Sequence, residues 1–289
     1  MRSEHAFTVR DALDSGMTPA ELRSAAWDAP ARGVRTAPAA PGGLLDAIRA
    51  LAADDQYFSH TTAALIHGMP LPRRLEEDPR VHLASPTGAG RMRRPGVVGH
   101  RLKSEVVLID GARVEAPADA FVHLATLLSV DELVAIGDWL VSPQRSQPSS
   151  VEELAAAIRR YAGARGLAKA RRALAQVRVG AESPRETAMR LLVVRAGLPA
   201  PVLQHEVRDA FGLFVGRLDL AWPALRLAVE YDGEHHFASA EAMERDVARL
   251  RELRRLGWTI IQVTKRDLRD GGRQIVRTIA EAFASCAAR

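Results

Sequence analysis

The strongest constraint on the fold is a pair of extended segments joined at Trp222-Pro-Ala-Leu225. Apolar and polar residues alternate along both segments, and successive side chains of a strand point to opposite faces of a sheet. The alternation therefore predicts a β-hairpin that places Asp219 beside Glu230, with Asp232 next along. One face should carry Leu218, Leu220, Trp222, Leu227, Val229 and Tyr231, and the other Arg217, Asp219, Ala221, Arg226, Ala228, Glu230 and Asp232.

A sheet face that gathers three carboxylates calls for a compensating charge. Like charges that face each other across two strands destabilise the sheet. A bound cation would offset them, and hard oxygen ligands suit Mg²⁺ or Mn²⁺. The alternative is a solvated face on which Arg217 and Arg226 neutralise the acids.

The elements around this hairpin are those of a mixed α/β domain. From Ser183 onward, helical and extended patterns follow one another in the order α-β-β-β-α-β-α. The helix at 241–257 has a regular apolar stripe and ends at Gly257, and the run WTIIQVT indicates a buried strand.

The acids resemble a known catalytic core. Asp219, Glu230 and Asp232, on a hairpin after an acidic helix, resemble the PD-(D/E)xK nucleases, most closely the branch of the very-short-patch repair (Vsr) endonucleases. The strings VEYDGEHHF, RDVARLRELRRLGW and TIIQVT resemble the small Vsr-like nuclease domains, over residues 183–289. The resemblance implies a restriction-endonuclease-like αβββαβ core and a metal-dependent endonuclease.

The resemblance assigns roles to individual residues. It implies that the carboxylates of Asp219 and Glu230 and the backbone carbonyl of Tyr231 are ligands of a Mg²⁺ or Mn²⁺ ion. Asp232 stands where the usual pattern has a lysine, so His235 or His236, with His236 preferred, is expected to act as the general base.

Several further residues have two interpretations each. Glu186 is either the helix-borne acid of the family or the partner of Ser183 in a capping box. Gln204 is an accessory candidate. Arg245 and Arg249, one helical turn apart, and Lys265 are candidate contacts to nucleic acid, with a solvated surface as the alternative.

The N-terminal part of the chain predicts a DNA-binding region. Residues 7–38 indicate a helix, a turn, a second helix from Thr18 to about Trp27 and a short strand that carries Arg32 and Arg35, as in a winged helix. The order of elements over residues 5–140 resembles the AbiEi-type antitoxins, which are winged-helix repressors. Histidines 60, 67, 82 and 100 have the residue type of a metal cluster, but structural histidines are the commoner case.

The expected domains are a winged-helix-like region (1–40), an AbiEi-like mixed middle (41–145), a helical connector (146–182) and the nuclease domain (183–289). The chain has 289 residues, a formal net charge of +5 and one cysteine, and it lacks a long apolar segment. We therefore expect a cytoplasmic protein with DNA as a partner, a possible protein partner for the N-terminal half and no membrane contact. Two functions remain open: a metal-dependent DNA endonuclease in bacterial defence or repair, and a DNA-binding regulator with an inactive nuclease fold.

Overall fold

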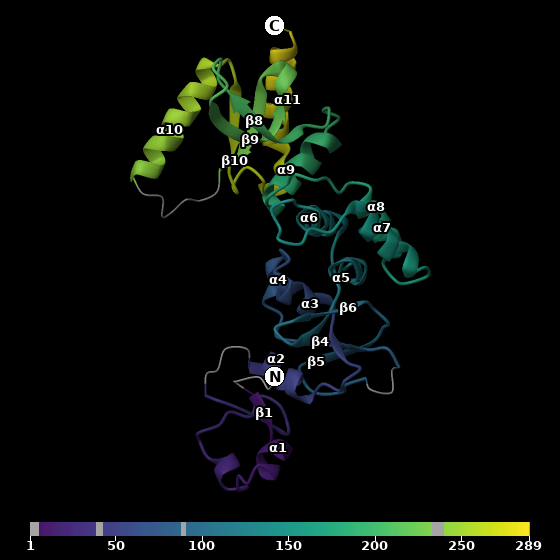
Figure 1. Cartoon of the computed structure of the whole chain (residues 1–289). Helices are drawn as coiled ribbons and strands as arrows, with labels where there is room; N and C mark the ends of the chain where they lie inside the picture. The colour runs from purple at the N-terminus through teal and green to yellow at the C-terminus, as the bar shows by residue number, and fades with distance from the viewer. Residues whose placement is uncertain (1–5, 39–42, 88–90, 233–239, 289) are drawn as a thin grey trace. The chain divides into compact units, whose positions relative to one another are not determined.

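The computed structural model describes residues 6–38, 43–87, 91–232 and 240–288. This part of the chain contains helices together with β-sheets of two, five and four strands, which confirms the mixed α/β fold (Figure 1). The chain divides into two compact units, one of Met1–Leu128 with Glu152–Ala170 and the other of Ser129–Val151 with Arg171–Arg289. No helix among the described residues is long and apolar enough to cross a membrane.

The N-terminal part of the first unit is a small two-stranded sheet with helices. Strand β1 (Ala6–Thr8) pairs antiparallel with β2 (Val34–Thr36), and α1 (Val9–Asp14) and α2 (Gly43–Leu51) accompany them. The expected first helix is therefore confirmed, and the short strand carries Arg35 as expected, whereas Arg32 lies in the turn before it.

The expected helix from Thr18 to Trp27 is wrong. The capping box forms, since the Thr18 N–H donates to the Glu21 carboxylate at 2.7 Å, but only a 3₁₀ turn, η1 (Glu21–Arg23), follows. Leu22 is the one buried side chain of that turn, so little apolar surface holds a longer helix in place. Trp27 instead packs edge-on against Phe7, with ring centroids 4.9 Å apart.

The five-stranded sheet of the first unit has the order β5-β4-β3-β7-β6. Strands β4 and β5 are parallel, with Ala84 opposite His100, and α3 and α5 pack against one another beside this sheet. The strands are β3 (Tyr57–Phe58), β4 (Val81–Ser85), β5 (Val97–Arg101), β6 (Val106–Ile109) and β7 (Ala112–Glu115), and the helices are α3 (His60–Ile66), α4 (Arg73–Glu76) and α5 (Pro117–Leu124).

The helical connector expected over 146–182 contains two helices, α7 (Val151–Arg160) and α8 (Leu167–Leu174). They separate at two glycines with left-handed backbone, Gly163 (φ 85°) and Gly166 (φ 82°). A side chain at Gly166 would also come within 3.0 Å of the Ala125 backbone, so only glycine fits this close approach.

The second unit contains the four-stranded sheet, in the order β11-β10-β9-β8, with β10 and β11 parallel. The element order from α9 to α11 is the predicted α-β-β-β-α-β-α. The elements are α6 (Val130–Leu140), α9 (Pro184–Arg195), β8 (Val202–Arg208), β9 (Phe214–Trp222), η2 (Pro223–Leu225), β10 (Leu227–Tyr231), α10 (Ala240–Arg255), β11 (Thr259–Val263), η3 (Arg269–Gly272) and α11 (Arg273–Ala287).

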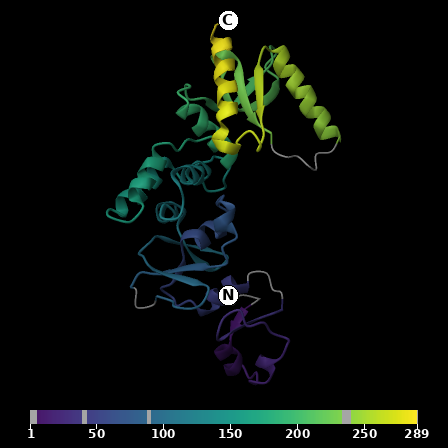
Figure 2. The same ribbon diagram turned by 180° about the vertical axis from the view of Figure 1, so that it is seen from behind.

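Helices cover both faces of this sheet (Figures 1 and 2). Leu220, Trp222 and Val229 form a core with residues of α9 and α11, such as Met189 and Ile279. The opposite core joins sheet residues to Leu253 of α10 and to Trp258. The buried strands of a sheet covered on both faces carry apolar residues on both faces.

One expectation about the hairpin needs correction. Leu218 and Leu220 were expected on one face, but Leu218 lies in the core with Leu253 and Leu220 lies in the core with Met189. The regular pairing of β8 with β9 omits the Gln204–Asp219 pair, and Gln204 has a left-handed backbone (φ 51°). The side chains of β9 therefore exchange faces at Asp219, beside the left-handed Gln204 of β8.

Candidate functional site

A group of carboxylates surrounds this interruption of the sheet. Asp219 comes from β9, Glu230 from β10 and Glu186 from the first turn of α9. The regular pairing of β9 with β10 ends at Leu220 and Val229, and Asp219 and Glu230 are the next residues of the two strands, near enough that the charge of Glu230 raises the pKa of Asp219. The Tyr231 backbone N–H donates to the Asp219 carboxylate at 2.8 Å.

The electrostatics of Asp219 follow from its surroundings. The pKa of Asp219 is raised to about 6, chiefly by burial; the Tyr231 N–H opposes the shift, and the negative charges of Glu186, Glu230 and Glu182 add to it. An Asp219 that is ionised at neutral pH is therefore unfavourable in the absence of a cation.

Glu186 takes part in the cap of α9, while its role as the helix-borne acid of the family stays a prediction. Its N–H donates to the Ser183 hydroxyl at 3.2 Å, and that hydroxyl donates to its carboxylate at 2.8 Å, so it caps α9. The Gln204 amide donates to the other carboxylate oxygen at 2.8 Å, and the side chain is 8% exposed. Gln204 thus helps to hold the nearly buried Glu186 carboxylate near Asp219, where its charge raises the pKa of Asp219.

Glu230 is compensated by a cation that the sequence did not suggest. Arg249 of α10 donates to both of its carboxylate oxygens, at 2.8 and 3.1 Å, and also to Asp246. These bonds, that to Glu230 first, raise the pKa of Arg249. The arginines of the alternative interpretation lie elsewhere, since Arg217 pairs with Glu182 at 2.9 Å and Arg226 donates to the Leu256 carbonyl at 3.1 Å.

The carboxylate oxygens are of the type that suits a hard divalent cation, but the described structure does not hold them as one set of ligands. In a strand the N–H and C=O of one residue point to the same edge, so the Tyr231 carbonyl lies on the Asp219 side. Glu230 would have to leave Arg249 to bind a metal. Within the described ranges, the carboxylates of Glu186, Asp219 and Glu230 are not among the metal-competent groups whose ligand atoms lie within 4.8 Å of one another.

The other expected catalytic residues are not gathered here. The Asp232 side chain is exposed, and its backbone N–H continues the ladder to the Val263 carbonyl at 2.8 Å. His235 and the expected base His236 lie outside the described residues.

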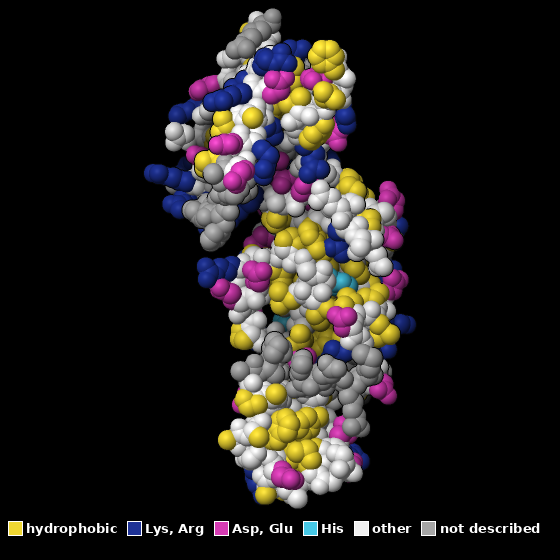
Figure 3. All heavy atoms as spheres, turned by 60° about the vertical axis from the view of Figure 1, so that its left-hand side comes forward, with side chains coloured by type: hydrophobic (Ala, Val, Ile, Leu, Met, Phe, Trp, Pro, Cys, Tyr) yellow, Lys and Arg dark blue, Asp and Glu magenta, His cyan; other side chains and the backbone are white. Residues whose placement is uncertain are grey.

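The candidate nucleic-acid contacts differ in solvent exposure and in the hydrogen bonds that they make. Arg32, Arg245 and Lys265 are exposed. Arg35 is half-buried and donates to the carbonyls of Leu22 and Val34, at 2.6 and 2.9 Å, which makes it a structural residue of the N-terminal sheet. Basic and acidic side chains mix on the surface in Figure 3, so no single-sign patch marks this view.

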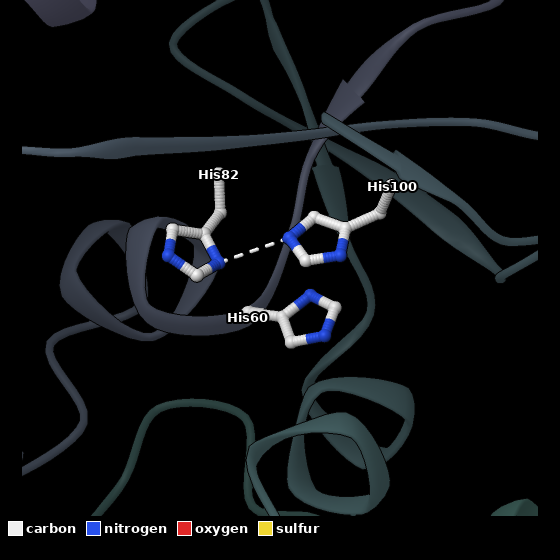
Figure 4. A group of neighbouring side chains, drawn as sticks. All are labelled: His60, His82 and His100. Carbon is white, nitrogen blue, oxygen red and sulfur yellow. Dashed lines mark hydrogen bonds between the residues drawn. The ribbon is translucent and has the colours of Figure 1, made fainter. Parts of the chain in front are cut away.

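A second group of titratable residues lies in the first unit. One nitrogen from each of His60, His82 and His100 lies within 4.8 Å of the others (Figure 4). His67 is not part of this group, because its Nε2 bonds to the Glu115 carbonyl at 2.7 Å. The residue types were visible in the sequence, but the pairing of β4 with β5 is what brings His82 and His100 together.

Burial keeps these imidazoles neutral. It lowers the pKa of His60 to about 2, with the neighbouring histidines as secondary causes, and it lowers the pKa of His100 to about 4. The pKa of His82 is also lowered by burial. Neutral imidazole is the form that coordinates metal ions.

Comparisons with known proteins identify relatives but no described activity. The chain is 33% identical over 211 residues to the uncharacterized protein Rv2248 of Mycobacterium tuberculosis (strain H37Rv), which covers 72% of this chain and 74% of that protein. The uncharacterized protein MT2308 of Mycobacterium tuberculosis (strain CDC 1551) matches to the same extent. No family model and no solved structure matches. At this identity and coverage, the chain belongs to the family of these uncharacterized mycobacterial proteins.

Proposed function

We propose that the chain is a divalent-metal-dependent DNA endonuclease, acting in bacterial defence or DNA repair, with Asp219 and Glu230 as metal ligands. The observation that carries the proposal is Asp219, whose pKa is raised to about 6 at a point of the sheet where Glu186 and Glu230 also lie. Folded proteins seldom keep such a charge-crowded carboxylate without a function for it.

In this proposal, separate residues would bind the metal ion, orient its ligands and hold the DNA. Asp219, Glu230 and the Tyr231 carbonyl would hold Mg²⁺ or Mn²⁺, which when bound would lower the pKa of a water and neutralise charge on the phosphate. Glu186 and Gln204 would orient this group. The scissile phosphate would come from DNA held in part by Arg245 and Lys265.

Arg249 has a specific place in this proposal. A guanidinium binds carboxylate and phosphate with the same bidentate geometry. When DNA arrives, Arg249 would exchange Glu230 for a phosphate, and Glu230 would become available to the cation. The resting ion pair would then protect the carboxylate until substrate is present.

The test is cleavage of supercoiled plasmid by the purified full chain in Mg²⁺ or Mn²⁺. We expect nicked or linear product, none with chelator, and none with Asp219→Asn. The loss should exceed the roughly 10- to 100-fold typical of an outer-shell partner. Glu206→Gln is the matched control, since Glu206 is an exposed β8 carboxylate paired with Arg208 at 2.9 Å. Cleavage by Asp219→Asn at the wild-type rate would refute the assignment.

The second candidate function is a DNA-binding regulator with an inactive nuclease fold. The absence of lysine at position 232 and the compensation of Glu230 by Arg249 favour it. It predicts duplex DNA binding that chelator does not change and no cleavage under any metal. Salt-sensitive binding without cleavage would support this function over the endonuclease.

A further inference from the structure

Three histidines of the first unit converge from separate elements. His60 begins α3, His82 lies on β4 and His100 lies on β5, and their rings face one another (Figure 4). The His60 and His100 rings stack with centroids 3.9 Å apart, and the His82 and His100 rings lie 5.0 Å apart. His60 and His82 are buried, while His100 is partly exposed and provides access from solvent.

The spacing of the nitrogens suits a tetrahedral metal. His82 Nδ1 and His100 Nε2 are 3.1 Å apart. Two imidazole nitrogens bound to one Zn²⁺ at about 2.0–2.1 Å in tetrahedral geometry are about 3.3 Å apart. A zinc ion would therefore need only a small separation of these two rings, with the third nitrogen already within 4.8 Å.

The backbone at His60 is strained in a way that presents its ring. His60 has a left-handed conformation (φ 50°), which is unfavourable for a residue with a side chain. The Glu115 carboxylate accepts its N–H at 3.1 Å, and the Ser59 hydroxyl contacts its Nδ1 at 3.1 Å. Strain of this kind concentrates at functional sites.

A fourth histidine beside the cluster has an unused nitrogen. The His123 ring stacks with that of His60, with centroids 5.4 Å apart, and His123 Nδ1 bonds to the Glu115 carboxylate. Its Nε2 is buried and, within the described part of the chain, has no hydrogen-bond partner. A buried polar atom without a partner is costly unless a ligand or water completes it. Carboxylate–histidine pairs of this type surround many metal sites.

We infer that His60, His82 and His100 bind one Zn²⁺ ion, with a water at the fourth position that donates to His123 Nε2. Three imidazole ligands with a water at the open position are the arrangement of zinc sites that can activate water or bind an anion. This site is separate in ligand chemistry from the proposed Mg²⁺ or Mn²⁺ site, because imidazole nitrogen prefers Zn²⁺ and carboxylate oxygen prefers the harder ions.

The test is titration of the chelator-treated full chain with Zn²⁺ against a chromophoric chelator, and with Co²⁺ as a spectroscopic substitute. We expect one equivalent of tight Zn²⁺, the visible bands of tetrahedral Co²⁺ and a higher melting temperature with Zn²⁺. His100→Gln, at the partly exposed ligand, should weaken binding by at least about 100-fold, since outer-shell changes alone cost about 10- to 100-fold. His60→Gln should do the same.

Two controls locate the ion. His205→Gln changes a half-buried histidine near Trp258, and Asp219→Asn with Glu230→Gln removes the acidic site. Both should keep the full Zn²⁺ equivalent. The proposal is overturned if wild type binds no Zn²⁺, if its Co²⁺ complex lacks tetrahedral bands, or if His100→Gln binds like wild type. Because the wild-type spectrum is itself decisive, a variant that fails to fold leaves the test intact.

Discussion

The histidine cluster of the first unit and the acidic group of the second differ in charge: the clustered imidazoles are neutral, whereas the carboxylates repel one another. The histidines are neutral, because burial lowers the pKa of His60 to about 2 and that of His100 to about 4. They can therefore lie in contact without a cation. The acids repel one another, which contributes to the raised pKa of Asp219, and the structure places Arg249 on Glu230 and hydrogen bonds on Glu186 and Asp219.

The difference shows how burial acts on the two kinds of ligand. Desolvation favours the neutral form of either group, which is the metal-binding form of histidine but not of aspartate. A nitrogen site can thus be preformed before the metal arrives. A site of carboxylate oxygens is not stable in its metal-binding form without a cation. In the metal-free protein, Glu230 is paired with Arg249 instead.

The largest effect on this comparison should come from removing the buried carboxylate that bonds to the histidines. Glu115 is fully buried and accepts bonds from the His60 N–H, the Ser104 hydroxyl and His123. Glu115→Leu should lower the free energy of unfolding by about 3–5 kcal/mol, because it leaves buried donors without a partner. Glu115→Gln should cost less. Equal free energies of unfolding for the leucine variant and wild type in chemical denaturation would show that the hydrogen bonds of Glu115 do not stabilise the fold.

Removing a carboxylate from the acidic group should have the opposite sign. The folded pKa of Asp219 is about 6, above its ordinary 3.8, so the folded state binds the proton more tightly and loses stability as the pH rises between these values. Asp219→Asn should therefore raise the free energy of unfolding by about 1–3 kcal/mol at pH 7.5. The gain should shrink as the pH falls from 7 to 4, as measured by denaturation at several pH values. A pH-independent loss would show that Asp219 is a structural partner.

Arg249 tests whether the resting ion pair competes with metal. Arg249→Met leaves the nearly buried Glu230 without its cation and should destabilise the metal-free protein by about 2 kcal/mol. Mn²⁺ should then raise the melting temperature more than it does in wild type. An identical Mn²⁺ shift in both proteins would exclude the proposed exchange. Arg255→Met, which removes an exposed pair with Glu252, is the control.

The smallest expected effect concerns DNA. Arg245 is exposed on α10, four residues before Arg249. Arg245→Ala should reduce the dependence of log K on log salt by about 0.9 if it neutralises one phosphate. Zn²⁺ and Mn²⁺ binding should not change. Fluorescence anisotropy at several salt concentrations measures the slope, and an unchanged slope would remove Arg245 from the DNA contacts.

The sequence by itself determined the order of elements in the second unit and the approach of Asp219 to Glu230. Both follow from local physics, since apolar periodicity selects helix or strand and a short turn sets the register of a hairpin. It also determined the cap on α9, because Ser183 and Glu186 are only one turn apart.

Only the tertiary structure decided the rest. Alternation put Leu218 and Leu220 on one face, but the structure places them in cores on opposite faces of the sheet. Arg249 reaches Glu230 from a helix 19 residues away, and His60, His82 and His100 meet through strand pairing. Such contacts join residues far apart in the chain. Their geometry depends on how whole elements pack, which no local pattern encodes.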